Sequence, residues 1–188
     1  MAQIIERRIA ALHRYVEEHP SADDRPDAAW NLILIRIWPR KVYDLRSLWG
    51  DFGAQVMEEL DRFVRDYPHS PYAGMAALYR GFVAFGTRSE DGTPDRPWRT
   101  GDVLALDRSL AETASKYAGS TPGGLALAWR LIVADRSSVD ELRPEVPAIK
   151  AKIDEGYGGD SEVQRLMSSR RARALAPDAG APDPGGSR

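Results

Sequence analysis

Residues 60–68 have the sequence Leu-Asp-Arg-Phe-Val-Arg-Asp-Tyr-Pro, and residues 12–20, Leu-His-Arg-Tyr-Val-Glu-Glu-His-Pro, align with them without a gap. The leucine, arginine, aromatic, valine, acidic and proline positions coincide. A third copy aligns with the second at its leucine, tyrosine and serine positions, Leu110, Tyr117 and Ser120. Internal repeats of this kind are the signature of arrays built from one supersecondary unit. The sequence therefore predicts three copies of one structural unit.

Each unit is predicted to contain two helices. In the first helix apolar residues recur every three or four positions, as in an amphipathic helix, at Ile5, Ile9, Leu12 and Val16, then at Val56, Leu60, Phe63, Val64 and Tyr67, then at Leu106, Leu110, Ala114 and Tyr117. The second helices, at 27–38, 72–85 and 124–134, are apolar nearly all round, which is typical of the inner helix of a stack. A proline stands at or near the start of each second helix, where its missing N–H costs nothing, at Pro26, Pro71 and Pro122.

Two longer connections are expected between the units, at 39–51 and 87–101. They account for a spacing between copies that exceeds the ~34 residues of the most compact helix-hairpin arrays. After the third unit, 139–153 and 161–175 are predicted as two further helices that cap the apolar end of the stack, the first interrupted by prolines at Pro144 and Pro147.

The C-terminal segment 176–188 is rich in Ala, Pro, Asp and Gly and is expected to be disordered. The expected organisation is thus a helical-hairpin repeat domain at 1–175 followed by this tail.

The second unit resembles a tetratricopeptide repeat. The residues that carry the likeness are 63–73, Phe-Val-Arg-Asp-Tyr-Pro-His-Ser-Pro-Tyr-Ala, with Ala76, Ala77, Leu78, Tyr79 and Gly81 after them. They are most similar to the repeats of outer-membrane assembly lipoproteins and cell-envelope coordinator proteins, in which a similar Tyr-Pro-x-Ser-Pro-Tyr-Ala turn joins the helices. The resemblance implies a right-handed α-solenoid whose concave groove holds a peptide or a partner helix, with no catalysis of its own.

Composition excludes several kinds of chemistry. The chain has no cysteine, so disulfides, thiolate zinc sites, iron–sulfur clusters and cysteine nucleophiles are ruled out. Its three histidines, at positions 13, 19 and 69, have no metal-ligand spacing, and no phosphate-binding glycine loop, nucleophile elbow or His-Glu-x-x-His motif occurs. We therefore expect neither an enzyme nor a bound cofactor or metal.

Charge and hydropathy point to a protein without a membrane segment. The most apolar run, 32–38, is interrupted at Arg36 and is far shorter than the ~20 residues of a spanning helix. The N-terminus reaches charge at Glu6 and lacks the pattern of a secretory signal. The formal net charge of -2 gives no overall attraction to nucleic acid. A cytoplasmic protein is expected.

Two arginines, Arg80 and Arg130, occupy the same repeat position inside otherwise apolar helices, and Arg36 lies in the corresponding helix of the first copy. A buried guanidinium must find a carboxylate or carbonyl partner, or open onto a groove. The sequence leaves both internal pairing and a ligand-facing role open.

Five further candidate residues, which mix aromatic and basic side chains, lie in the connections or directly before the first one: Trp38, Tyr43, Arg46, Trp49 and Trp98. Such a mixture suits an aromatic and arginine contact with a protein, or base stacking on nucleic acid. The alternative is that the aromatic rings pack under the hairpins and the charges point outward.

The sequence thus predicts a protein–protein interaction or scaffolding module that binds a peptide or helix of another protein within a larger assembly. Its contact candidates are the five connection residues together with Arg80 and Arg130. The alternative is an accessory subunit that binds nucleic acid or a small ligand through its groove arginines, although a nucleic-acid partner is disfavoured by the net charge. A homo-oligomer is left open.

Overall fold

A computed structural model of the chain describes residues 2–37, 51–88, 99–137 and 139–175. These residues form eight α-helices and one 3₁₀ helix and contain no strand, which confirms the all-α class. The predicted tail at 176–188 lies outside the described residues.

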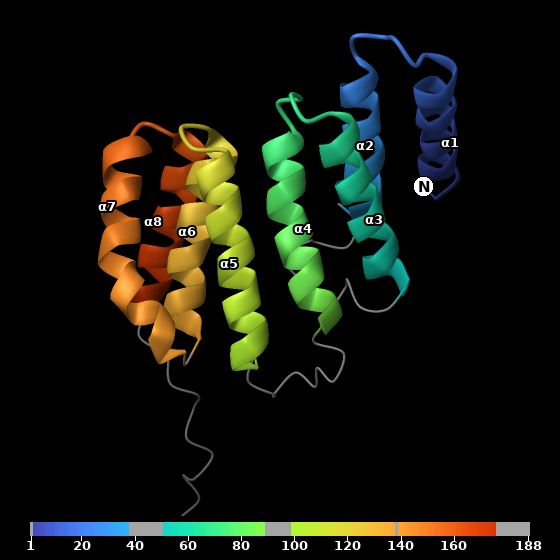
Figure 1. Ribbon diagram of the computed structural model, residues 1–188. Helices are drawn as coiled ribbons and strands as arrows, with labels where there is room; N and C mark the ends of the chain where they lie inside the picture. The colour runs from blue at the N-terminus through green and yellow to red at the C-terminus, as the bar shows by residue number, and fades with distance from the viewer. Residues whose placement is uncertain (1, 38–50, 89–98, 138, 176–188) are drawn as a thin grey trace, which may run out of the picture.

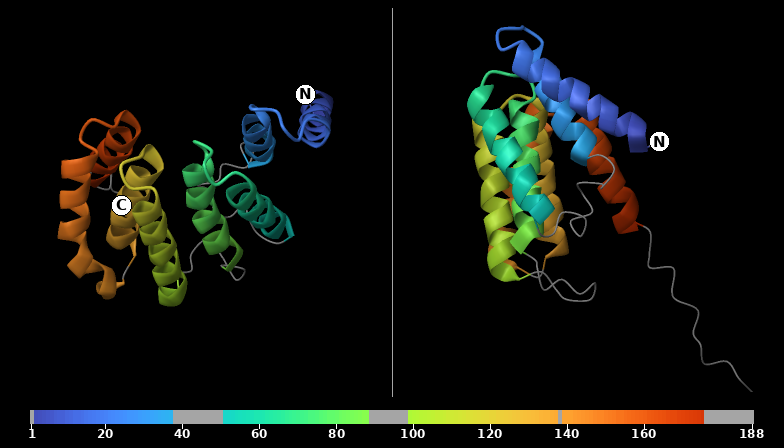
Figure 2. Two further views of the ribbon diagram at one scale, coloured as in Figure 1. Left: turned by 45° about the horizontal axis from the view of Figure 1, so that its top comes forward. Right: turned by 90° about the vertical axis from the view of Figure 1, so that its right-hand side faces the viewer.

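The helices follow one another in short antiparallel pairs (Figure 1). Their bounds are α1 Ala2–Glu18, α2 Arg25–Ile37, α3 Asp51–Asp66, α4 Ala73–Arg88, α5 Thr100–Lys116, α6 Thr121–Arg136, the 3₁₀ helix η3 Asp140–Glu145, α7 Val146–Gly156 and α8 Ser161–Leu175. Each helix packs against the next in chain order from α1 to α7, and α6 also packs against α4 and α8. Figure 2 shows α3 and α5 on one side of the molecule and α6 and α8 on the other.

The helix ends depart from the sequence prediction mainly at the connections. Helix α4 continues to Arg88 and α5 already begins at Thr100, so both helices take residues from the expected connection at 87–101. The interruption predicted at two prolines is confirmed. Pro144 lies inside η3, and Pro147 stands in the first turn of α7, where a missing N–H leaves no hydrogen bond unmade.

The core begins at the second helix and is densest around α6. Leu60 and Leu110 are fully buried, whereas Leu12, at the same repeat position, is only half-buried. The difference arises because α1 lies at one edge of the molecule and packs mainly on α2 (Figure 1). Among its residues whose burial is described, none is buried.

One turn joins the two helices of each pair, and the four turns share one pattern of backbone hydrogen bonds. The N–H of Tyr67 donates to Phe63 O at 2.9 Å, and the carbonyl of Tyr67 accepts from Ser70 N–H at 3.1 Å. The same two bonds occur around the corresponding residues His19, Tyr117 and Tyr157. Helices α7 and α8, expected as a cap, are therefore joined in the same way as the three pairs before them.

Candidate partner-binding surface

The structure describes two of the seven residues predicted to contact a partner. Trp38, Tyr43, Arg46, Trp49 and Trp98 lie outside the described residues, so their role stays a prediction. Arg80 lies in α4 and Arg130 in α6.

Arg130 is buried and pairs with two carboxylates. Its Nε and Nη2 each donate to one oxygen of Asp107 at 2.8 Å, and Nη2 also donates to Glu145 Oε2 at 2.5 Å. The hydrogen bonds to Asp107 raise the pKa of Arg130, which burial alone would lower, and the bond to Glu145 raises it further. The guanidinium therefore stays charged and ties α6 to α5 and to η3.

Arg80 occupies the same repeat position but lies at the surface. Its side chain is 46% exposed, and its Nε donates to Asp61 of α3. In the first pair, Arg36 donates from Nη1 to Glu59 of α3 and contacts His13 of α1 through Nη2, at 3.2 Å from the ring Nε2. All three repeat arginines therefore have a carboxylate partner on another helix.

A tyrosine at the end of α3, α5 and α7 packs against the pair of helices before it. The ring of Tyr117 lies against Gly74, where an added Cβ would come within 3.1 Å of it, and the ring of Tyr157 lies against Gly124, where the distance would be 2.4 Å. The third tyrosine, Tyr67, lies under the Arg25 guanidinium, 5.7 Å from the ring centre. The two glycines thus provide the room that a tyrosine of the following pair fills.

Aromatic side chains also link successive second helices. Trp30 of α2 stacks on Tyr79 of α4, with ring centroids 5.8 Å apart. Phe82 of α4 meets Trp129 of α6 edge to face at 4.9 Å. Trp30, Tyr79 and Trp129 occupy corresponding positions in their helices, but Trp129 is reached from Phe82, three residues after Tyr79. Successive second helices are thus joined by aromatic rings in both cases, through different positions of the earlier helix.

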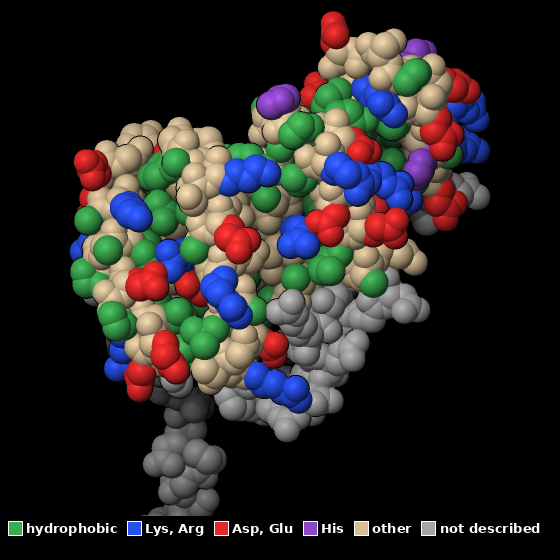
Figure 3. Space-filling view, viewed as in Figure 1, with side chains coloured by type: hydrophobic (Ala, Val, Ile, Leu, Met, Phe, Trp, Pro, Cys, Tyr) green, Lys and Arg blue, Asp and Glu red, His purple; other side chains and the backbone are tan. Residues whose placement is uncertain are grey.

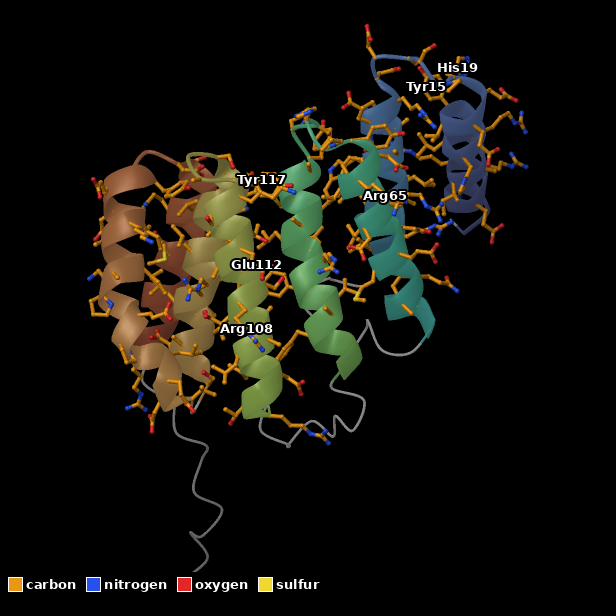
Figure 4. All side chains as sticks on the ribbon, in the orientation of Figure 1. Tyr15, His19, Arg65, Arg108, Glu112 and Tyr117 are labelled. Atoms are coloured by element: carbon orange, nitrogen blue, oxygen red, sulfur yellow. The ribbon has the colours of Figure 1, made fainter. Side chains whose placement is uncertain are left out.

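The outward sides of α3 and α5 form the candidate surface, which we call the α3–α5 face. It comprises the exposed residues Ala54, Glu58, Arg62 and Arg65 of α3 and Gly101, Arg108, Glu112 and Ser115 of α5, together with Arg80 between them. Figure 4 shows Arg65, Arg108 and Glu112 on these two helices, and Figure 3 shows the mixture of basic and acidic side chains on this side of the molecule.

The ion pairs of this face are solvent-exposed. Arg62 donates to Glu58 one turn away at 2.9 Å, with 58% and 73% of the two side chains exposed. Arg65 contacts Asp66 at 3.3 Å. Exposed pairs of this kind contribute only about 0–1 kcal/mol, so their charges can be re-paired by another molecule at little cost.

Two contacts between helices were not predicted from the sequence, the ion pair of Arg130 with Asp107 and the packing of Tyr157 on Gly124. Asp107, the main partner of Arg130, lies on the apolar side of its helix, next to Leu106 and one turn from Leu110. An acidic residue on an apolar helix face indicates a buried ion pair, because a buried carboxylate needs a partner. The contact between Gly124 and Tyr157 had a weaker signal, a tyrosine followed by a Gly-Gly-Asp-Ser turn.

The described residues contain no group of three or more side chains suited to a metal ion, and none of their helices is long and apolar enough to cross a membrane. No protein-family model, no curated protein and no solved structure matches this chain.

Proposed function

We propose that the protein is an interaction module, a solenoid of tetratricopeptide-like helix hairpins that holds a peptide or helix of a partner protein within a larger assembly. The recurrent tyrosine contact supports the solenoid, because Tyr67, Tyr117 and Tyr157 each join one hairpin to the hairpin before it in the same place. Stacking of equivalent units in this way buries a continuous core and leaves extended faces for binding.

The α3–α5 face is the proposed contact surface, and its exposed charges are the observation on which the proposal depends. Arg62 and Arg65 on one helix, and Arg108 and Glu112 on the other, present charges of both signs on neighbouring hairpins. A partner helix with complementary charges can exchange these weak surface pairs for intermolecular ones. Arginine is also among the residues that contribute most to protein interfaces.

The pairing of the repeat arginines favours a protein partner over a small ligand. Arg130 has its charge neutralised by Asp107 and Glu145, and recruiting it to a ligand would leave a buried carboxylate without a partner. Arg80 is the more accessible of the two predicted arginines and belongs to the α3–α5 face.

Site-specific photo-crosslinking in cells tests the proposal. A photoreactive amino acid placed at Arg62 or Arg108 should yield a discrete crosslinked protein, identified by mass spectrometry, and the same probe at Lys150 on α7 should not. The double variant Arg65→Glu, Arg108→Glu should lower capture at least about tenfold at an unchanged urea midpoint. Equal crosslinking at all three positions, or steeply salt-dependent retention on nucleic acid instead, would rule the assignment out.

The connection residues need a separate test. Replacing Arg46 and Trp49 together by alanine should abolish capture of that crosslinked partner if 39–51 belongs to the contact surface. Unchanged capture would remove this connection from the surface and leave the α3–α5 face as its whole extent.

A further inference from the structure

Helix α1 has an outward face that no other described element covers. Arg7, Ala11, Arg14 and Glu18 are spaced four, three and four residues apart, so they form one stripe along the helix, and all four are exposed. Figures 1 and 2 show α1 at one edge of the molecule, and its main neighbour is α2. The stripe belongs to a different helix from the α3–α5 face.

The charges of α1 are placed against the helix dipole. The N-terminal part of the stripe carries Arg7, while the last turn carries Glu17 and Glu18; the first turn has no acidic residue and the last turn no basic one. A helix favours the opposite arrangement, because its N-terminus is partly positive and its C-terminus partly negative. Within the described part of the chain, neither Arg7 nor Glu18 has an ion-pair partner. This arrangement of charges is unfavourable for α1 as an isolated helix.

We infer that this stripe binds the same stripe of a second copy of the chain, with the two α1 helices antiparallel about a two-fold axis. An antiparallel copy brings the basic end of each helix to the acidic end of the other, so Arg7 faces the partner's Glu18 twice by symmetry. Each acidic end then also lies beside the positive end of the other helix dipole. The stripe is complementary to itself, which is what a two-fold interface requires.

The middle of the stripe suits this contact. With Arg7 opposite the partner's Glu18, Ala11 lies opposite the partner's Arg14, and the small alanine side chain leaves room for that arginine. The longer Arg14 lies beside Ala11, one turn from Glu18 of its own helix, which offsets the arginine charge.

The contact is small, and the dimer is correspondingly weak. A helix of 17 residues is about 25 Å long, and one pair of such helices falls in the smallest class of protein interfaces. We expect a weak, reversible dimer that weakens further as salt screens the charges.

Sedimentation of the full chain at about 50 mM salt tests the proposal through charge exchange. The variants Arg7→Glu and Glu18→Arg each place like charges opposite one another, so each should raise the dissociation constant at least about tenfold. Mixing the two variants should restore a dimer, because one stripe is then acidic at both ends and the other basic at both ends. The double variant Arg7→Glu, Glu18→Arg should also dimerise. Lys150→Glu on α7 is the matched control and should behave as the unaltered chain.

Three results would overturn the inference: an unaltered chain that stays monomeric at about 200 μM and low salt, single variants that dimerise as well as the unaltered chain, or a mixture that stays monomeric. Misfolding does not obscure the outcome, because both substitutions agree with the helix dipole and the helical circular dichroism of each variant checks the fold.

Discussion

At the scale of single residues, a shared repeat position does not give a shared environment. Arg80 and Arg130 correspond in sequence, yet the first is at the surface and the second is 8% exposed. The two differ because η3, which comes directly after α6, supplies Glu145 next to Arg130. Periodicity predicted that both arginines face inward in apolar helices, but it could not predict which acidic residues would meet them.

Replacing Arg130 by methionine should destabilise the protein by about 3–5 kcal/mol, because the buried carboxylate of Asp107 then loses its partner. Arg80→Met, which removes an exposed pair, is the matched control and should cost no more than about 1 kcal/mol. Urea unfolding measures both. Equal losses would contradict the buried pair, and adding Asp107→Leu to Arg130→Met should recover much of the stability.

We expect the stability of the fold to depend on pH through the carboxyl group of Asp160. Partial burial would raise the pKa of this carboxyl, but it accepts hydrogen bonds from the hydroxyl of Thr121 and from the N–H groups of Val163 and Glu162, and these together lower it. A pKa that is lower in the folded state stabilises the fold above the ordinary aspartate value, near pH 4. That contribution is lost as the pH falls from there through the lowered value.

The variant Asp160→Asn should remove this component, so stability should fall less steeply than in the unaltered chain below about pH 4. Asparagine is a comparable helix N-cap, which keeps the start of α8 intact. Thermal unfolding of both proteins between pH 2 and 6, roughly the range in which carboxyls titrate, measures the difference. Parallel pH profiles would show that Asp160 is not the group responsible.

At the scale of elements, the helices themselves were predictable because their apolar spacing is regular. The turn residues and prolines also placed the reversals, and the first helix of each pair was found from positions such as Leu60 and Leu110. The fourth pair was missed as a pair: α7 is short, its start is taken up by η3, and its residues align poorly with the other copies. It resembles the other pairs in the backbone hydrogen bonds around Tyr157 and in the packing of the Tyr157 ring on a glycine of the pair before it.

The packing of α6 on α8 depends on the absence of a side chain at Gly124. An alanine there would place its Cβ 2.4 Å from the ring of Tyr157 and 2.7 Å from Val163, so we expect Gly124→Ala to cost about 1–3 kcal/mol despite its better helix propensity. Gly101→Ala, where nothing lies within 4 Å, is the matched control and should be neutral or stabilise by up to about 1 kcal/mol. Denaturant unfolding compares the free energies of unfolding of the two variants. A stabilising Gly124→Ala would show that the Tyr157 ring moves aside without cost.

At the scale of the whole molecule, burial rises from one edge toward α6. Helix α1 contributes no buried residue among those described, whereas α6 packs against α4, α5, α7 and α8. The sequence indicated a row of paired helices but not this gradient, because burial depends on how many neighbours each element finally has. The candidate surface was equally unpredictable, since exposure of α3 and α5 is a property of the assembled molecule.

Hydrogen exchange should follow the same gradient. Amides of α1 should exchange through local opening at a much lower free energy than amides of α6, which should approach the protection of global unfolding. Exchange measured by mass spectrometry at a concentration well below that of the proposed dimer gives the comparison. Equal protection of the two helices would contradict it. In concentrated samples, α1 should become more protected if the two-fold contact forms.

The meeting of tyrosine and glycine gives the molecule a polarity. In both such contacts the glycine is in the earlier pair and the tyrosine in the later one. A duplicated copy of the middle pair would therefore find a fitting neighbour on both sides, with its own tyrosine on the original Gly74 and Tyr117 on its own glycine. Lengthening by tandem duplication is therefore built into the geometry of this chain, whereas inverting or reordering its pairs is not.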